Sequence, residues 1–264
     1  GCSTACYAAR AGKKVLLLER ETFPRDKVCG DALGWKTLGF LEEFGRSPEN
    51  FTSPSAPWRG MRGSSPNGTV ADFRLPPNSD EYRDTGWCQK RVHLDHYLFE
   101  MASELVKEAG GEVREGVTVE SCIVHEERIQ GIRLHNTGSK NEGVEEHRAT
   151  LTVGAGGFNC PVSRCIIEEI HNEPLVEERH YAAAIREYWE NVDGCSDMIE
   201  AHWIDGIIPG YFWIFPVGEN TFNVGLGCIQ SDLNKKEMKL RKMLKFVTQE
   251  HPVFAKRFAN ATLI

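Results

Sequence analysis

The sequence predicts an α/β fold made of two interleaved parts, and three features of the chain indicate it. Residues 3–11 have the composition of a short helix, and Gly12 then precedes the apolar run Val15–Leu18. Residues 94–109 form an amphipathic helical pattern, and several short β-type segments gather after residue 180. An unbroken Val/Leu run is typical of a parallel strand covered on both faces. The late strands indicate a second, β-rich part.

The remaining elements follow from periodicity and from turn residues. Helices are expected at 35–44, at 94–109 with an end at Gly110–Gly111, and at 234–249. Strands are expected at 69–75, 117–124, 129–134, 147–153, 181–189, 199–204, 211–215 and 221–226. The strands at 117–124, 129–134 and 147–153 predict a three-stranded meander with turns at 130–131 and 136–138.

Bulk composition excludes several classes of function. The chain has 264 residues, of which 41% are hydrophobic, so it can bury a substantial core. The formal net charge of -7 and the lack of a basic stripe argue against nucleic-acid binding. No run of about 18 apolar residues could span a bilayer, while peripheral contact with a membrane surface stays open.

The cysteine pattern points to reduced thiols and a cytoplasmic location. The nine cysteines are Cys2, Cys6, Cys29, Cys88, Cys122, Cys160, Cys165, Cys195 and Cys228. Their number is odd and their spacing contains no CxxC pair of the zinc or thioredoxin kind. No metal site is therefore expected.

The first segment has the order of the second half of a dinucleotide-binding βαβ unit: a helix, a glycine, a strand and an acid. Glu19 follows the strand and could accept hydrogen bonds from an adenosine ribose. Gly1 could be the last glycine of the phosphate loop, whose preceding strand is absent, so we expect the chain to be a fragment. The alternative is a surface glutamate that follows any parallel strand.

The segment 19–33, ERETFPRDKVCGDAL, resembles without a gap the loop after the ribose acid in the geranylgeranyl reductase family of flavoproteins. The resemblance implies a p-hydroxybenzoate hydroxylase-like flavoprotein fold. In that fold, residues 1–56 and 89–170 would form a Rossmann-like FAD-binding domain that lacks its first strand. Residues 57–88 and 171–264 would form a β-rich substrate domain that is truncated, because the family continues past Ile264 into a further FAD-binding segment.

The same resemblance implies which residues contact FAD. They are Gly1, Glu19, Arg20, Cys29, Gly30, Ala32, Arg91, Val119 and Gly157. Arg91 opens the segment RVHLDHYL, similar to the start of a family helix from which an arginine reaches the cofactor, and Val119 would lie under the adenine. The alternatives are a solvated arginine and a core valine. Residues 154–157 stand where related flavoproteins have Gly-Ala-Asp-Gly, so Gly156 replaces the acid.

The segment 210–218, GYFWIFPVG, resembles the Tyr-x-Trp-x-Phe-Pro-x-Gly signature of the geranylgeranyl reductases. Strand alternation places Tyr211, Trp213 and Phe215 on one face. The resemblance favours a wall of a slot for a long apolar substrate, whereas aromatic residues on a strand are otherwise most often core.

The function implied by the resemblance is FAD-dependent reduction of carbon–carbon double bonds in geranylgeranyl or related isoprenoid chains, with NAD(P)H or ferredoxin as electron donor. Cys29 is the candidate catalytic residue, because a thiol with a pKa of about 8.5 is mostly protonated near neutrality and can donate a proton. Two alternatives stay open. One is a flavin-dependent monooxygenase or halogenase on the same fold, and the other is a non-catalytic module that binds prenyl lipids.

Overall fold

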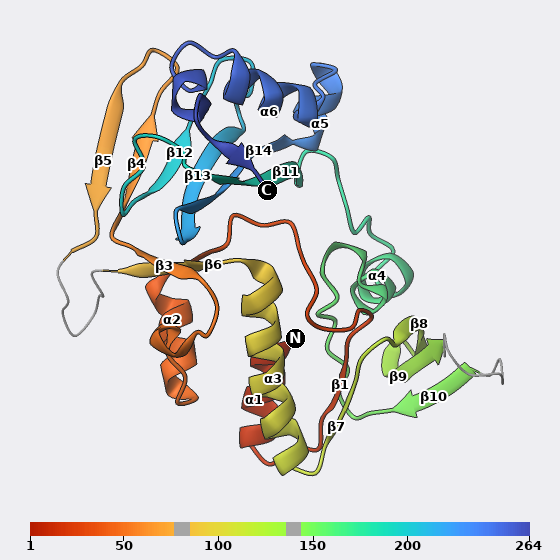
Figure 1. The fold of residues 1–264 in the computed structure, drawn as a ribbon. Helices are drawn as coiled ribbons and strands as arrows, with labels where there is room; N and C mark the ends of the chain where they lie inside the picture. The colour runs from red at the N-terminus through yellow and green to blue at the C-terminus, as the bar shows by residue number, and fades with distance from the viewer. Residues whose placement is uncertain (77–84, 136–143) are drawn as a thin grey trace. The chain divides into compact units, whose positions relative to one another are not determined.

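The structure is a computed structural model that describes residues 1–76, 85–135 and 144–264 (Figure 1). Contacts divide the chain into unit 1, residues 1–26 and 94–177, and unit 2, residues 27–93 and 178–264. The expected division assigned residues 27–56 to the first part, whereas the contacts assign them to unit 2. Strands at both ends of that segment pair with a later strand of unit 2. The expected roles of the two parts stay predictions.

Unit 1 opens with α1 (Cys2–Arg10) and β1 (Leu16–Leu18). β1 pairs in parallel with β7 (Glu112–Arg114). Gly111 permits this approach, because a Cβ there would lie 2.4 Å from the Val15 carbonyl oxygen. The strand is present as expected, but its residues are half-buried rather than fully buried. Its sheet has two strands among the described residues, so β1 is an edge strand and lacks a neighbour on one side.

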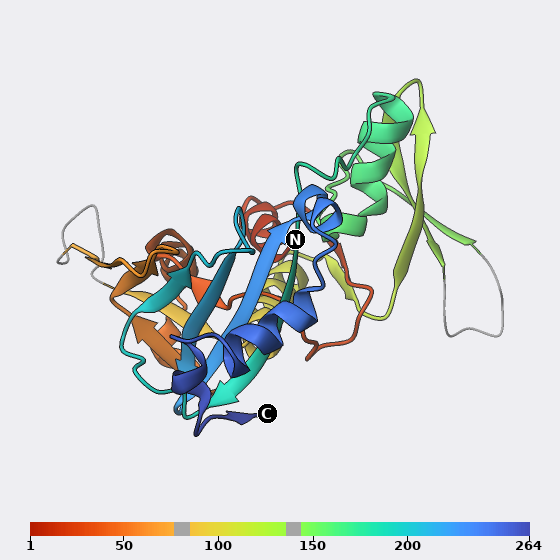
Figure 2. The same cartoon turned by 90° about the horizontal axis from the view of Figure 1, so that it is seen from above.

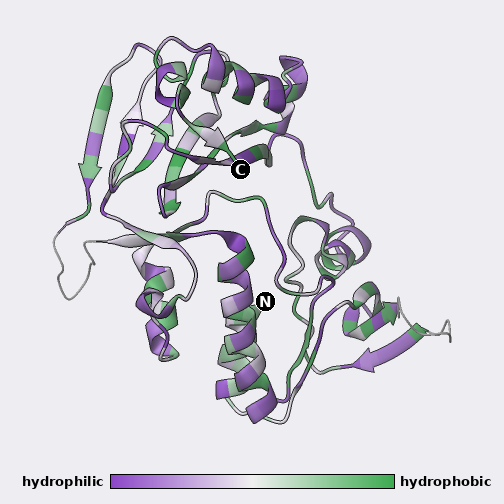
Figure 3. Ribbon diagram, in the orientation of Figure 1, coloured by the Kyte–Doolittle hydropathy of each residue, from purple (hydrophilic) through white to green (hydrophobic). Residues whose placement is uncertain are grey.

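Helix α3 (Arg91–Glu108) begins in unit 2 and continues into unit 1. Its buried apolar residues include Leu94, Met101 and Val106, and Figure 3 shows the alternating hydrophilic and hydrophobic bands along it. Gly110, with φ 73°, ends the helix where expected. No helix in the described parts of the chain combines the length and apolarity needed to cross a membrane.

The meander of unit 1 contains β8 (Thr118–His125), β9 (Arg128–His135) and β10 (Val144–Arg148), paired antiparallel in the order β10-β9-β8. The turn expected at 130–131 is wrong, since β9 runs through it. The hairpin turns at Glu126 and Glu127, whose φ angles of 48° and 59° suit a two-residue turn. The turn expected at 136–138 lies outside the described residues.

The third strand of the meander is displaced from its expected position at 147–153. β10 ends at Arg148 and is hydrophilic over most of its length (Figure 3). Cross-strand charge pairing holds it, because Arg133 of β9 contacts Glu146 at 3.0 Å. Apolar periodicity cannot reveal such a strand. The chain continues through η2 (Gly157–Asn159), α4 (Pro161–Arg164) and the π-helix η3 (Cys165–Ile170).

Unit 2 contains a small and a large sheet. The small sheet has the order β2-β6-β3, from β2 (Ala32–Leu33), β6 (Gly86–Gln89) and β3 (Ser55–Trp58). Between β2 and β3 lie α2 (Trp35–Glu43) and η1 (Pro48–Asn50). The large sheet has the order β15-β11-β14-β13-β12-β4-β5. Its strands are β4 (Gly60–Ser64), β5 (Val70–Arg74), β11 (Ala182–Glu190), β12 (Ile199–His202), β13 (Tyr211–Gly218), β14 (Thr221–Ile229) and β15 (Thr262–Leu263).

The two faces of the large sheet differ in what they pack against. One face carries the main apolar core, with Phe212, Ile214 and Leu226 from the strands and Leu244 from helix α6 (Leu240–Gln249). Figures 1 and 2 show α6 lying along this face. Since side chains alternate along a strand, Tyr211, Trp213 and Phe215 of β13 belong to the opposite face.

The single helix expected at 234–249 is wrong, because two helices occupy this part of the chain. Helix α5 (Gln230–Lys235) ends before Glu237, whose φ of 51° lies in the left-handed region. The Met238 amide donates to the Leu233 carbonyl and closes the turn. The uninterrupted polar and apolar periodicity of the sequence does not mark this stop.

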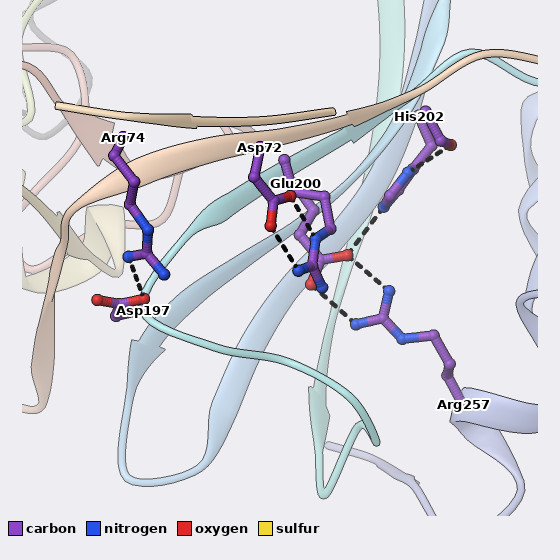
Figure 4. Close-up of polar contacts among 8 residues, drawn as sticks. Asp72, Arg74, Asp197, Glu200, His202 and Arg257 are labelled. Carbon is purple, nitrogen blue, oxygen red and sulfur yellow. Dashed lines mark hydrogen bonds and ion pairs between the residues drawn. The ribbon is translucent and has the colours of Figure 1, made fainter. Parts of the chain in front are cut away.

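A buried ionic network joins β12 to the short helix η4 (Ala255–Phe258), as Figure 4 shows. The Arg257 guanidinium donates to both Glu200 carboxylate oxygens, at 2.6 and 2.9 Å. His202 Nε2 lies 2.9 Å from Glu200, and Ser64 Oγ lies 2.8 Å from His202 Nδ1. Burial alone would raise the pKa of Glu200, but hydrogen bonds from Arg257 and His202 outweigh it and lower that pKa. The network is therefore a charged anchor within the core.

Candidate functional site

A cavity of about 190 Å³ in unit 2 brings together two of the segments that the sequence singles out. Its lining residues are Cys29, Gly30, Asp31, Ala32, Tyr211, Trp213 and Phe215. The first four belong to the loop before β2 and to its start, and the last three belong to β13. A larger depression, of about 510 Å³, lies on the β9–β10 hairpin of unit 1 and contains none of the predicted residues.

The loop lies directly against the aromatic strand. A Cβ on Gly30 would lie 2.7 Å from Cε2 of Phe215, so only glycine permits this approach without a shift of the ring. Asp31 follows with a φ of 71°, a left-handed conformation that aspartate tolerates better than most residues. Ala32 then pairs with Cys88 of β6, which fixes the end of the loop on the small sheet.

The three aromatic residues of β13 form a continuous row along the cavity. The ring centroids lie 5.9 Å apart for Tyr211 and Trp213 and 6.4 Å apart for Trp213 and Phe215. Trp213 covers Gly225 of β14, where an added Cβ would come within 2.3 Å of the indole ring. The exposed fraction rises from 6% at Trp213 to 41% at Tyr211, so the row reaches from the interior to the surface.

Two polar residues that the sequence analysis did not single out, Asn223 and Tyr188, contact the loop, and Asn223 also connects it to the aromatic row. The Trp213 indole N–H donates to Asn223 Oδ1 at 2.8 Å. Asn223 Nδ2 donates to the Cys29 carbonyl at 2.6 Å and to Asp31 Oδ2 at 2.7 Å. The Tyr188 hydroxyl donates to the same Asp31 oxygen at 2.8 Å. Asn223 thus holds the backbone of the loop and the wall of the cavity in one arrangement.

One signal in the sequence could have pointed to these residues. Asn223 is a lone polar residue within the apolar strand TFNVGLG, and Asp31 directly follows the Cys-Gly pair. Buried polar groups need partners, so an isolated asparagine in such a strand indicates a specific hydrogen bond. Its partners stand up to 194 residues away in the chain, so no local pattern identifies them.

Asp31 is the most unusual group of the cavity, because its carboxyl is 1% exposed. Burial raises the pKa of Asp31, although hydrogen bonds from Asn223 and Tyr188 and the charges of Arg186 and Arg91 oppose this effect. Oδ2 accepts two hydrogen bonds, whereas Oδ1 is buried without a hydrogen-bond partner among the described residues. A buried oxygen without a partner is costly and calls for an explanation.

The other residues predicted to contact FAD lie elsewhere in the fold. Arg91 is the first residue of α3 and belongs to unit 2. Gly1, Glu19, Arg20, Val119 and Gly157 belong to unit 1. The last of these has a φ of 76°, which favours glycine. Gly1 approaches the 154–157 turn, since a Cβ on it would lie 3.8 Å from that of Ala155.

Glu19 stands immediately after β1, as expected for a residue that meets a ribose. Its carboxylate accepts from the Glu21 amide at 3.1 Å and from Arg25 at 3.3 Å. Arg25 also contacts Asp95 at 2.5 Å. A carboxylate has about four acceptor positions, so Glu19 keeps capacity for further donors. Arg20 is exposed and pairs with the neighbouring Glu21.

Known proteins resemble this chain in sequence over part or nearly all of its length. Residues 181–262 match the geranylgeranyl reductase catalytic domain. The menaquinone reductase of Mycobacterium tuberculosis is 28% identical over 94% of this chain and 57% of its own length. The digeranylgeranylglycerophospholipid reductase of Methanosarcina acetivorans is 29% identical over 96% of this chain and 58% of its own length. The chain therefore spans somewhat more than half the length of these relatives.

Solved structures share the fold over the whole chain. A geranylgeranyl bacteriochlorophyll reductase-like protein from Thermoplasma acidophilum matches with a TM-score of 0.79 and 21% identity, over all of this chain and 61% of its own. The FAD-dependent myxobacterial chondrochloren halogenase matches with a TM-score of 0.78 and 22% identity, over all of this chain and 58% of its own. The expected α/β flavoprotein fold is thus confirmed. The match at residues 181–262 and the two relatives confirm the predicted resemblance of this chain to the geranylgeranyl reductase family.

Proposed function

We propose that this chain is part of an FAD-dependent reductase that saturates carbon–carbon double bonds in prenyl chains. The observation that carries the proposal is the cavity of unit 2, where the Cys29–Ala32 loop meets the aromatic row of β13. The two segments carry the two family-like motifs of the sequence and are about 180 residues apart in the chain. Because both motifs line the same cavity, we assign them to one site.

The residues of unit 1 fit the adenosine end of FAD. The N-terminus of α1 has Gly1 as its N-cap, with no side chain capping it and no acidic residue in its first turn. Free amide groups at a helix N-terminus favour a pyrophosphate. Glu19 offers the acceptor that a ribose needs. When bound, FAD would supply the hydride, and the resemblance implies that Cys29, Gly30, Ala32 and Arg91 contact it.

The cavity suits an apolar chain better than a polar substrate. The rings of Trp213 and Phe215 line it, and an engineered apolar cavity of about 150 Å³ is known to bind benzene. A volume of about 190 Å³ therefore accommodates roughly one double bond with its nearest carbons. The relatives named as prenyl-lipid and menaquinone reductases support a prenyl substrate. The proton for the second alkene carbon would come from an acid of this cavity, and Cys29 is the candidate from the sequence.

Replacing Glu19 with alanine is expected to weaken FAD binding by about tenfold or more, since a charged hydrogen bond contributes about 1.5–3 kcal/mol. Glu21→Ala is the matched control, because Glu21 is exposed and pairs with Arg20. Titration of the apoprotein with FAD, followed by flavin fluorescence, measures both. Equal losses in the two variants, or none at Glu19, would remove Glu19 from the FAD site.

Oxygen dependence separates the reductase from the flavin-dependent halogenases that share the fold. A reductase converts a prenyl alkene without oxygen once its flavin is reduced, whereas a halogenase or monooxygenase needs oxygen for turnover. Retention of flavin through purification addresses the third possibility, a non-catalytic module that binds prenyl lipids. Protein that binds prenyl lipid but no flavin would favour that module over the reductase.

A further inference from the structure

We propose that Asp31 is the acid that donates the proton to the alkene, a role that rests on the proposed reductase function. Three side chains of the cavity lining can donate a proton, the Cys29 thiol, the Asp31 carboxyl and the Tyr211 hydroxyl. Asp31 is the most deeply buried of them, with 1% exposure, and one of its oxygens has no partner among the described residues. The hydrogen bonds around it determine which oxygen can carry a proton.

Asp31 Oδ2 accepts from Asn223 and from Tyr188, so both donors already point at this oxygen. A proton on the carboxyl therefore resides on Oδ1, where no donor competes with it. Asp31 lines the cavity and its Oδ1 is buried, so the proposed role requires that a ligand bound in the cavity reaches this oxygen. The unsatisfied buried atom is thus explained as a donor whose acceptor is the substrate.

The loop holds this carboxyl in a fixed orientation. The Gln89 amide of β6 donates to the Asp31 carbonyl at 3.2 Å, and Asn223 donates to the preceding Cys29 carbonyl. The side chain is therefore tied through Oδ2 and the backbone through its carbonyl groups. Such orientation is what proton transfer to carbon requires, since the acid must meet one particular atom.

The surroundings favour a protonated resting acid and can stabilise the carboxylate that remains after transfer. The titratable groups around Asp31 are Cys29 of its own loop, Cys88 of β6, Tyr188 and Arg186 of β11, and Arg91 of α3. Burial raises the pKa of the Asp31 carboxyl above its ordinary value of 3.8, which favours the protonated form. The cations Arg186 and Arg91 lower the cost of the anion.

The proposed step balances as a two-electron reduction. Reduced FAD, when bound, would supply a hydride to one alkene carbon, and the other carbon would receive the proton of Asp31. The carbon–carbon π bond breaks and two carbon–hydrogen bonds form, so the alkene is reduced and the flavin is oxidised. Asp31 is left as a carboxylate, which takes up a proton from solvent before the next turnover.

The test compares Asp31→Asn with the wild-type protein. Asparagine has the same shape as aspartic acid and keeps an oxygen that can accept from Asn223 and Tyr188. Its amide nitrogen replaces Oδ1 and cannot donate a proton as an acid. With pre-reduced flavin and a geranylgeranyl substrate, we expect the rate of alkene reduction to fall about 10²- to 10⁴-fold, with substrate binding nearly unchanged. The exposed Asp205 provides the control, Asp205→Asn, for which no change is expected.

A second readout is independent of activity. Because the pKa of Asp31 is raised in the folded protein, its protonated form stabilises the fold below the ordinary value of 3.8, and this contribution is lost as pH rises through the folded pKa. Asp31→Asn has no such titration. The melting temperature of Asp31→Asn, relative to that of the wild type, should therefore increase as pH rises from 3.8 through the folded pKa of Asp31.

Four outcomes would contradict the proposal. Wild-type rates in Asp31→Asn would overturn the role of Asp31 alone, and so would a greater loss in Cys29→Ala than in Asp31→Asn. A wild-type protein that reduces no prenyl alkene with its reduced flavin would overturn the proposed function and this role together. A melting difference that does not change with pH would show that Asp31 does not titrate as proposed.

Discussion

Replacing Trp213 with alanine is expected to raise the KM for a long prenyl substrate about ten- to a hundredfold while the fold survives. Loss of an apolar side chain from a contact removes about 1.5–3 kcal/mol, and each tenfold in affinity corresponds to about 1.4 kcal/mol. Trp213 lines the cavity between Tyr211 and Phe215, so a prenyl chain lying along the row would contact its ring. The KM for a short prenyl substrate should change little.

Trp189→Ala is the matched control for a tryptophan that packs against the apolar core and does not line the cavity of unit 2. Trp189 is partly buried against the main apolar cluster and lies 5.2 Å from Phe258 between ring centroids. Truncating a fully buried tryptophan costs about 3–5 kcal/mol of stability, so the loss at partly buried Trp189 should lie below this range and should still lower the melting temperature. Thermal unfolding followed by flavin fluorescence is measured together with reduction of prenyl substrates of two lengths. If Trp213→Ala melts as early as Trp189→Ala, or loses activity equally with long and short prenyl substrates, Trp213 is a core residue. The hypothesis that Trp213 lines the substrate slot is then wrong.

Glu200→Gln is expected to lower the free energy of unfolding by about 3 kcal/mol, since removing one charge strands the other inside the protein. The Glu200 side chain is 1% exposed and faces the Arg257 guanidinium, which keeps 17% exposure. That residual exposure places the expected cost near the lower end of the range for buried pairs. Asp197→Asn is the control, because the Arg74–Asp197 pair is about half exposed, and little change is expected there (Figure 4).

The same pair gives a dependence on pH with a defined sign. The pKa of Glu200 is lowered in the folded protein, so its contribution is complete above the ordinary value of 4.5 and is lost as pH falls through the folded pKa. The stability difference between wild type and Glu200→Gln should therefore shrink at acid pH. Urea unfolding at several pH values measures it. A difference that stays constant or grows on acidification would contradict the assigned ionic network.

The sequence predicts those elements in which the spacing of apolar side chains marks the buried face. Helix α3 and strands β11, β13 and β14 have clear periodicity, and the structure has them close to the expected limits. It does not reveal β10, which cross-strand charges hold, or the stop at Glu237, where a backbone in the left-handed region divides α5 from α6. Both depend on interactions that leave no apolar pattern.

The candidate site shows the same limit. The Cys29 loop and the aromatic strand follow from motifs, because each is contiguous in the chain. The link between them does not, since Asn223 contacts Cys29 and Asp31 across more than 190 residues. Its position is set by the register that places Asn223 between Phe215 and Tyr188 in neighbouring strands. Tertiary pairing alone therefore creates the polar connection on which the inferred role of Asp31 depends.

The most direct test of the proposed reductase function is a single turnover of the protein without oxygen. Its FAD is reduced first, a geranylgeranyl substrate is added, and flavin absorbance and product mass are followed together. The account predicts that the absorbance of oxidised flavin returns as the substrate appears with two added hydrogens for each double bond reduced. Flavin that stays reduced until oxygen is admitted, with no hydrogenated product, would contradict the account and favour an oxygen-activating enzyme.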